Sequence, residues 1–385
     1  MNKRGILLAY DFPPSEGGIQ TLMRDFVAAP SGIEWSVVTR RRERSAPETV
    51  VCPATRIRLR PQRKLRDRVW LRLHPRASMP DFISYQAGPT LLRLARKHSA
   101  KFLFADQLCC ATAVRNVAAR TGLPWGLWVL GKELLRASEE TRVVLSSANV
   151  LLACSKFTKD LAVAAGAKDE CVFVVHPCID ALRFEPLEDR DGVRRQLGLE
   201  ECPVLLTVAH LVQRKGHEAI LHALAAMRDC GTDVQYLVVG KGPAEGALKE
   251  LVISLDLSNA VRFCGYVPDA DLPAYYGAAD LHVMPSLCDG DVEGFGISFI
   301  EAAACGTPSI GSDSGGIPDA IVENVTGCLV PPGDAKALAN CIQSLLADPA
   351  SLVSLRRSAR QTAIEQFSSS VFAERLTSIL GQHMR

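Results

Sequence analysis

Short apolar runs alternate with helical runs along most of this chain, and this alternation constrains the fold more than any other feature. Buried strands are expected at residues 5–10, 35–39, 101–105, 125–130, 149–153, 171–175, 203–209, 235–239 and 281–285. Strands separated by helices pair in parallel, because the helix carries the chain back to the end of the sheet where the next strand begins. The sequence therefore predicts an α/β fold built on parallel sheets.

Length and composition indicate two domains of a soluble protein. A chain of 385 residues is too long for one ordinary core. Its 48% hydrophobic and 22% charged residues are typical of a globular protein. The 13 cysteines are scattered without zinc-site spacing, which favours reduced thiols and a cytoplasmic location. Neither a signal peptide nor a membrane-length apolar run is recognised, so we expect a cytoplasmic protein.

The positive charge is concentrated near the N-terminus. Residues 40–76 hold 13 Lys or Arg against three acidic residues, whereas the whole chain has a net charge of only +2. Leu65, Val69, Trp70 and Leu73 recur there at helical spacing. A basic amphipathic helix suits an anionic membrane surface, so residues 56–76 predict peripheral membrane contact. A solvated basic loop is the alternative; nucleic acid is not expected, because no binding motif accompanies the charge.

Residues 291–308 form the strongest candidate site. Glu293 and Glu301 stand eight positions apart around a glycine-rich turn, Gly294-Phe295-Gly296, that opens an apolar helix. Such a turn aims backbone N–H groups and the positive helix end at one point, where an anion is held. The alternative is an acidic first turn plus one solvated glutamate. Since Glu301 falls within an apolar run, where an unpaired carboxylate is costly, we favour one ligand held at two places.

The sequence E-G-F-G-I-S-F-I-E, followed by A-A-A-C-G-T-P, resembles the E-x7-E motif of one enzyme family. That family comprises the retaining, nucleotide-sugar-dependent glycosyltransferases of family 4, also called glycosyl transferases group 1. The resemblance implies the GT-B fold, with two Rossmann-like domains whose parallel sheets face a central cleft. We place the N-terminal acceptor domain at 1–185 and the nucleotide-sugar donor domain at 186–366. A C-terminal helix, about 367–385, is expected to pack back on the first domain.

In the donor domain, the resemblance assigns the two glutamates to opposite parts of a nucleotide sugar. Glu301 would hold the ribose hydroxyls, and Glu293 would contact the sugar hydroxyls near the reacting carbon. The N–H groups of Gly294, Phe295 and Gly296 would bind the diphosphate.

Further donor contacts come from two other motifs. Lys215 matches the lysine of G-R-x-x-x-x-K-G, which clamps the diphosphate; a solvated loop lysine is the alternative. His210 stands where that motif usually has arginine, and Arg214 is expected to compensate. Fixed cations at this point stabilise the charge that the leaving diphosphate accumulates. Tyr266 lies in a segment resembling V-x-F-x-G-x-V, which packs against the nucleotide base.

The resemblance is weaker in the first domain. Gly17 and Gly18 match a P-P-x-x-G-G loop near the donor phosphates, unless they serve only the turn. Glu133 matches an acceptor-side motif in which Leu130 occupies the usual histidine position. Either Glu133 or Asp106 is expected to supply the acceptor-side polar contact, with solvated loop positions as the alternative.

Taken together, these residues predict transfer of a hexose-type sugar from a UDP- or GDP-sugar to an acceptor hydroxyl. The expected acceptor is a glycan or glycolipid of the cell envelope, which agrees with the basic helix. Neither a metal nor a cofactor is expected, because no D-x-D is placed beside these cations.

Two other functions compete with this prediction. A catalytically silent GT-B scaffold is one, since His210 and Leu130 depart from the family pattern. An NAD-dependent Rossmann enzyme is the other. Gly240-Lys241-Gly242 nearly spells a dinucleotide fingerprint, but Pro243 intrudes and the third glycine comes one residue late.

Overall fold

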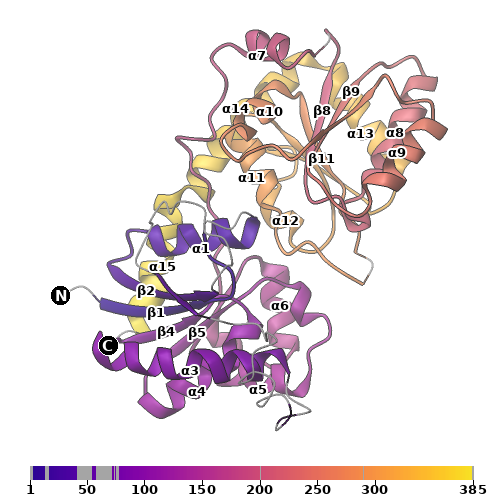
Figure 1. The fold of residues 1–385 in the computed structure, drawn as a ribbon. Coiled ribbons are helices and arrows are strands. Elements are labelled where there is room, and N and C mark those ends of the chain that lie inside the picture. Colours follow the sequence, from indigo (N-terminus) through magenta and orange to yellow (C-terminus); the bar gives the residue numbers. More distant parts are fainter. Residues whose placement is uncertain are drawn as a thin grey trace. The chain divides into compact units, whose positions relative to one another are not determined.

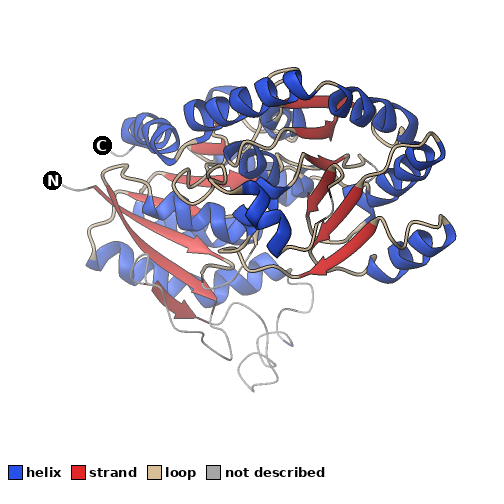
Figure 2. Ribbon diagram, turned by 90° about the horizontal axis from the view of Figure 1, so that it is seen from above, coloured by secondary structure: helices blue, strands red, loops and turns tan. Residues whose placement is uncertain are grey.

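The computed structural model describes residues 3–13, 17–40, 54–57, 72, 74, 78–199, 201–288 and 290–383. The chain divides into two compact units (Figure 1). The first contains Met1–Pro177 and Ser370–Arg385, and the second contains Cys178–Ser369. Figure 2 shows strands flanked by helices in each unit.

The first unit is built on a seven-stranded sheet in the order β3-β2-β1-β4-β5-β6-β7, with every pairing parallel. Its strands are β1 (Lys3–Ala9), β2 (Ile33–Arg40), β3 (Ala54–Ile57), β4 (Phe102–Ala105), β5 (Trp125–Val129), β6 (Val150–Ala153) and β7 (Val172–Val174). Its helices are α1 (Gly18–Ala28), α3 (Met79–Lys97), α4 (Leu108–Thr121), α5 (Glu139–Ser147), α6 (Lys156–Ala164) and α15 (Ser369–His383). The central strands are continuous apolar runs because helices cover both faces of a parallel sheet.

The second unit has a six-stranded parallel sheet in the order β10-β9-β8-β11-β12-β13. Its strands are β8 (Val204–Val208), β9 (Gln235–Val239), β10 (Val261–Gly265), β11 (Leu281–Met284), β12 (Ser309–Ser312) and β13 (Gly327–Val330). Its helices are α7 (Arg190–Gln196), α8 (His217–Asp229), α9 (Glu245–Ser254), α10 (Leu272–Ala278), α11 (Ile297–Ala304), α12 (Ile317–Ala320), α13 (Ala335–Ala347) and α14 (Pro349–Phe367). The two sheets confirm the predicted α/β class with parallel strands.

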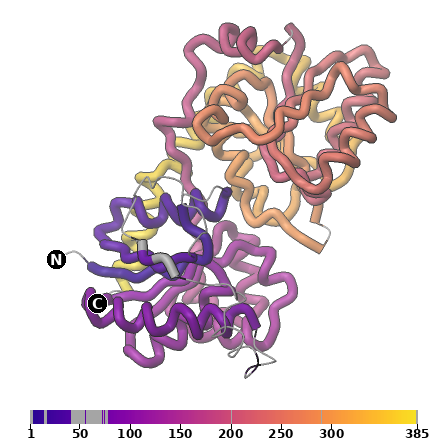
Figure 3. The backbone as a smooth tube through the Cα atoms, viewed as in Figure 1, coloured from indigo at the N-terminus to yellow at the C-terminus, as the bar shows by residue number. Residues whose placement is uncertain are grey.

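The C-terminal helix α15 completes the core of the first unit. In Figure 3 its yellow tube lies among the indigo and purple segments of that unit. The ring of Phe372 stacks on Trp128 of β5 with a centroid separation of 6.0 Å. Lys3 at the start of β1 donates a hydrogen bond to the carbonyl of Gly381 at 3.0 Å. The chain therefore returns to its first domain after completing the second.

The division between the units falls at 177/178, whereas we expected it near residue 185. Residues 178–185 bond to the second unit, which explains the difference. Ile179 N donates to the carbonyl of Phe367 at 2.8 Å. Arg360 on α14 donates to the carbonyls of Phe184 and Ala181 at 2.6 and 3.1 Å. Long-range bonds of this kind leave no signal in the local sequence.

Two elements of the first unit differ from the sequence prediction. The sequence predicts a helix at residues 86–98, but helix α3 begins earlier, at Met79. Ser78 accepts from the backbone N–H of Asp81, and the Asp81 carboxylate accepts from the N–H of Ser78. This capping box was visible in the sequence. Strand β3 was not predicted at all.

Most of the basic segment lies outside the described residues, and with it most of the segment 56–76 that is expected to contact a membrane; residues 56 and 57 belong to strand β3. Residues 14–16 of the P-P-x-x-G-G loop also lie outside the described residues. Among the described residues, no helix combines the length and the apolar character that a bilayer span requires.

Candidate active site

The second sheet has a topological switch point between its two central strands. The chain runs outward from β8 through β9 and β10, then returns to start β11 on the other side of β8. In open parallel sheets, ligands bind at the carboxyl ends of the strands that flank such a point. The loops after β8 and β11 meet there, and they carry Lys215 and Glu293 respectively.

Glu293 joins two cations in a tight ion-pair cluster. Its Oε2 accepts hydrogen bonds from Lys215 Nζ and from Arg214 Nη1, the latter at 2.7 Å. Arg214 Nε also lies 3.3 Å from Asp291 Oδ2. The side chains of Glu293, Lys215 and Arg214 are only 13%, 12% and 21% exposed. The fold thus brings together Glu293, Lys215 and Arg214, which the family resemblance assigns to the donor sugar and its diphosphate.

The cluster keeps Glu293 ionised. Burial by itself would raise the pKa of this carboxyl, but the charges of Lys215 and Arg214 outweigh burial and hold the pKa below its ordinary value. At neutral pH the site therefore contains two cations that are compensated by carboxylates of the protein itself. An incoming anion would have to compete with those carboxylates.

Glycines shape the loop that presents Glu293. Gly296 precedes α11 with φ of +92°, a conformation that other residues avoid. Gly316 N donates to the carbonyl of Glu293 at 2.8 Å. A Cβ on Gly315, where φ is +57°, would lie 2.5 Å from that carbonyl oxygen. The Gly315-Gly316 turn after β12 therefore fixes the backbone beneath Glu293, and only glycine fits at its first position.

Glu301 lies on α11, as expected, but its neighbour was not foreseen. The hydroxyl of Tyr276 on α10 donates to Glu301 Oε2 at 2.8 Å. Sequence reasoning also missed the contact of Asp291 with Arg214. Asp291 lies two residues before Glu293, so its position could have identified it as a candidate site residue. No local pattern links Tyr276 to Glu301, because the two residues are 25 positions apart on different helices.

The remaining donor-side candidates lie on the same edge of the second sheet. His210 follows β8 and is exposed, and Tyr266 follows β10 and is 50% exposed. Phe295 is buried, and its ring lies 5.7 Å from that of Phe367, so its side chain belongs to the core. The side chains of His210 and Tyr266 are therefore accessible from solvent, whereas the buried Phe295 can offer only its backbone.

The first unit has its own switch point, between β1 and β4. Gly17 caps α1 with φ of +136°, and Gly18 begins that helix. Asp106 directly follows β4, where its Oδ2 accepts from Tyr10 N at 2.9 Å and bridges the two strand ends. Glu133 follows β5, and its Oε1 accepts from Leu130 N at 2.6 Å. All four residues thus lie at the carboxyl edge of this sheet, although Glu133 is engaged in its own turn.

We expect Asp106 to make stability fall as the pH rises. Burial raises its pKa to about 7, whereas an aspartate in an unfolded chain has a pKa of about 3.9. Between these values the folded protein retains a proton that the unfolded chain has lost, so the free energy of unfolding decreases with pH. Asp106→Asn, which cannot ionise, should lack this decrease. Urea unfolding at about pH 5 and about pH 7.5 measures it. An equal pH dependence of stability in the wild type and in Asp106→Asn would contradict a raised pKa of Asp106 in the folded protein.

The described residues include no group of three or more His, Cys, Asp or Glu side chains arranged to hold a metal ion. The charged side chains that gather at the switch point of the second unit are mainly Lys215, Arg214 and their two carboxylate partners.

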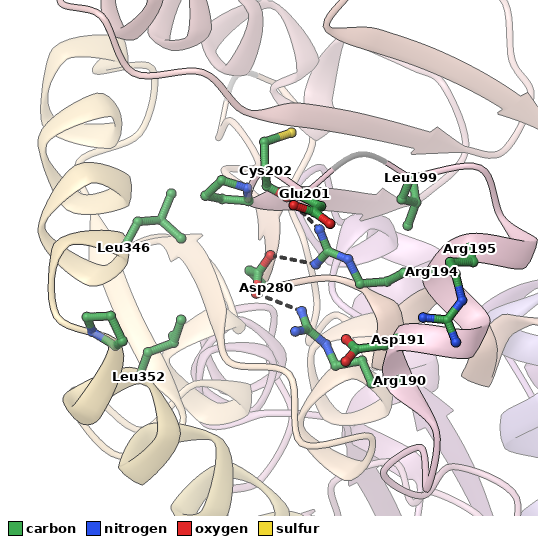
Figure 4. Close-up of a pocket in the computed structure, with 12 residues that line it drawn as sticks. Arg190, Asp191, Arg194, Arg195, Leu199, Glu201, Cys202, Asp280, Leu346 and Leu352 are labelled. Carbon is green, nitrogen blue, oxygen red and sulfur yellow. Dashed lines mark hydrogen bonds and ion pairs between the residues drawn. The ribbon is translucent and has the colours of Figure 1, made fainter.

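A cavity of about 570 Å³ lies at the opposite edge of the second sheet (Figure 4). There Asp280 pairs with Arg190 at 2.6 Å and with Arg194 at 3.2 Å. Both arginines also donate to the carbonyl of Ala278, at the end of α10. Because these guanidinium groups already bond to Asp280 and to the end of α10, we interpret the cluster as a structural ion-pair network that holds α7 against α10.

Comparison with known proteins indicates the enzyme class of this chain. The model of the family "Glycosyl transferases group 1" matches residues 189–365, which include the Lys215, Glu293 and Glu301 motifs. A GDP-mannose-dependent alpha-(1-6)-phosphatidylinositol monomannoside mannosyltransferase of Mycolicibacterium smegmatis is 28% identical to the chain, over 97% of each protein. Residues 189–365 therefore form a group 1 glycosyltransferase domain.

A second relative is a glycosyltransferase as well, and a solved structure shows the fold. A GDP-mannose-dependent monoacylated alpha-(1-6)-phosphatidylinositol monomannoside mannosyltransferase of Corynebacterium glutamicum is also 28% identical, over 100% of this chain and 99% of that protein. Anabaena HepE in complex with UDP matches with a TM-score of 0.79 at 20% identity, covering 98% of this chain and 100% of HepE. This glycosyltransferase therefore has the predicted GT-B fold, and the NAD-dependent alternative is set aside.

Proposed function

We propose that this glycosyltransferase moves mannose from GDP-mannose to a hydroxyl group of a glycolipid, with retention of the anomeric configuration. The observation that carries sugar transfer is the cluster of Glu293, Lys215 and Arg214 at the switch point of the donor unit. The choice of GDP-mannose and of a glycolipid acceptor rests on the two relatives described above, each of which is similar over nearly its whole length.

In this proposal the cations exchange partners when the donor binds. Lys215 and Arg214 turn from the Glu293 carboxylate to the diphosphate, together with the backbone N–H groups at the start of α11. The negative charge on the diphosphate grows as the glycosidic bond breaks. Cations held in a largely buried site stabilise that charge more strongly than water does. Since they supply the positive charge, we propose that transfer requires no metal ion.

The glutamates would then hold the two ends of the donor. Glu293, released from the cations, would accept hydrogen bonds from sugar hydroxyls near the reacting carbon. Glu301 would accept from the ribose hydroxyls, and Tyr266 would contact the base. A carboxylate offers about four lone-pair sites, so Glu301 can bind ribose while it retains the hydrogen bond from Tyr276.

The chemical step would form a bond from the acceptor oxygen to the anomeric carbon and break the bond from that carbon to the β-phosphate oxygen. The acceptor proton would pass to the leaving phosphate, on the face from which the phosphate departs. This front-face route is our hypothesis for retention. Asp106 and Glu133 are the acceptor-side candidates, and the segment 56–76 would bring the enzyme to the inner membrane surface where a glycolipid acceptor resides.

Ligand binding followed by turnover tests the proposal. GDP should raise the melting temperature more than UDP, ADP or NAD, because a ligand that binds only the folded state stabilises it. GDP-mannose with a phosphatidylinositol mannoside in anionic vesicles should then give a mannosylated product. EDTA should not inhibit the reaction, and NMR should show an α-linkage.

Each contrary result affects a defined part of the proposal. If UDP alone stabilises the protein, the donor is a UDP-sugar and not GDP-mannose. If EDTA inhibits the reaction, the proposed metal independence is wrong. If turnover is equal in neutral and anionic vesicles, the proposed membrane contact through residues 56–76 is wrong. If no donor gives turnover, the alternative of a catalytically silent GT-B scaffold is favoured.

A further inference from the structure

Tyr276 makes a direct hydrogen bond to Glu301, the second glutamate of the motif. Its side chain is fully buried on α10, and its hydroxyl donates to Glu301 Oε2 at 2.8 Å. Helices α10 and α11 are neighbours in the second unit (Figure 1). Burial and the charge of Glu301 raise the pKa of this phenol well above its ordinary value. The hydroxyl is therefore a permanent hydrogen-bond donor to the carboxylate.

The tyrosine ring is held on several sides. Its centroid lies 6.0 Å from that of Phe184 and 5.8 Å from that of His282, in edge-to-face geometry. His282 in turn contacts Phe299 on α11, with centroids 5.2 Å apart. Thr307 Oγ1 donates to the backbone carbonyl of Tyr276 at 2.6 Å. The hydroxyl is thus fixed relative to the helix that carries Glu301.

This arrangement differs from the other buried tyrosine network of the same unit. The hydroxyl of Tyr236 contacts Thr207 Oγ1 at 2.8 Å and His217 Nδ1 at 2.9 Å. Burial lowers the pKa of His217 to about 4, so that network is uncharged at neutral pH. Tyr276, in contrast, bonds to the half-buried carboxylate of Glu301, and removing a carboxylate from water is costly unless it is hydrogen-bonded.

We propose that Tyr276 is a positioning residue that orients the carboxylate of Glu301 toward the two ribose hydroxyls of the donor. The inference rests on the proposed function, in which Glu301 binds ribose. A ligand-contacting side chain is most effective when a second residue fixes its rotamer before the ligand arrives. Without the Tyr276 hydroxyl, Glu301 would rotate more freely and would lose part of its affinity for ribose.

The experiment compares two nucleotides that differ only in the ribose. Calorimetry gives the affinities for GDP and for 2′,3′-dideoxy-GDP, with UDP and its dideoxy analogue in parallel. The wild-type protein should prefer the ribonucleotide. Tyr276→Phe removes one oxygen atom and should weaken ribonucleotide binding about tenfold, the lower end for a hydrogen bond to a charged group. Its affinity for the dideoxynucleotide should barely change.

Two further variants serve as controls. Tyr236→Phe deletes an equally buried tyrosine hydroxyl away from Glu301 and should leave the ribose preference unchanged. Glu301→Gln should lose the ribose preference, and adding Tyr276→Phe to it should cost no further affinity if the tyrosine acts only through the glutamate. This double variant keeps the test decisive even if Tyr276→Phe also lowers stability.

The outcomes separate this inference from the proposed function. If Glu301→Gln binds the ribonucleotide as tightly as the wild type does, the ribose role of Glu301 is wrong. If Glu301→Gln weakens binding but Tyr276→Phe does not, the positioning role alone is overturned. Equal weakening of both nucleotides by Tyr276→Phe would likewise overturn it, because a purely structural defect does not distinguish the two sugars.

Discussion

Replacing Lys215 with methionine should lower kcat by about 10²- to 10³-fold, the usual loss when one fixed donor to a developing negative charge is removed. Lys215 is 12% exposed, so its charge acts in a poorly solvated site. Methionine preserves most of the unbranched apolar stem and removes the ammonium group. Arg214 remains beside Glu293, which should limit the loss of stability. Initial rates with GDP-mannose measure the effect.

Lys249→Met is the matched control for this prediction. Lys249 pairs with Glu245 at 2.7 Å within α9, and its side chain is 51% exposed. An exposed pair of this kind contributes little, so both stability and kcat should stay close to those of the wild type. A Lys215→Met enzyme with unchanged kcat and a raised KM would show that Lys215 binds the donor without stabilising the transition state.

Much of the fold could be predicted because its strands are short, continuous apolar runs between helices. The bounds expected for residues 235–239 coincide with β9, and a helix expected at residues 335–347 coincides with α13. Strand β3 escaped prediction because it is the edge strand of its sheet and reads Ala-Thr-Arg-Ile. An edge strand has a neighbour on one side only, so it need not be a continuous apolar run.

Sequence analysis predicted those residues of the candidate site that lie within a short motif. Glu293, Glu301 and the glycine turn occupy a single stretch of sequence, and Lys215 lies in the loop that follows a predicted strand. The contact of Arg214 with Asp291 and that of Tyr276 with Glu301 join separate loops and helices. Only the packing of β8 beside β11, and of α10 beside α11, creates such contacts. Sequence spacing contains no information about them.

Replacing Glu293 with glutamine should separate donor binding from catalysis. Without a ligand, Glu293 compensates Lys215 and Arg214, and a diphosphate must displace it. A neutral amide removes that competition, so GDP should bind the variant severalfold more tightly. The contact proposed for the sugar hydroxyls weakens at the same time, and kcat should fall about 10²-fold, like other losses of a fixed polar contact in a transition state. Calorimetry with GDP and initial rates with GDP-mannose give the two quantities.

The same substitution should destabilise the protein when no nucleotide is present. Breaking a buried ion pair costs about 3 kcal/mol or more, because the remaining charges lose their compensation. The sign with pH follows from the lowered pKa of Glu293. Its ion pairs stabilise the folded protein above the unfolded pKa of about 4.3, and this stabilisation is lost as the pH falls through the folded pKa. Glu293→Gln should lack that acid-side loss, and GDP should raise its melting temperature more than it raises that of the wild type.

Glu245→Gln tests whether these effects are specific to the cluster. Glu245 pairs with Lys249 on the surface of α9, so the same change there should alter neither GDP affinity nor the acid limb of stability. Weaker GDP binding by Glu293→Gln would mean that Glu293 helps to hold the donor and does not compete with it. The exchange of partners by Lys215 and Arg214 would then be wrong, and the ion pairs would have to persist in the donor complex.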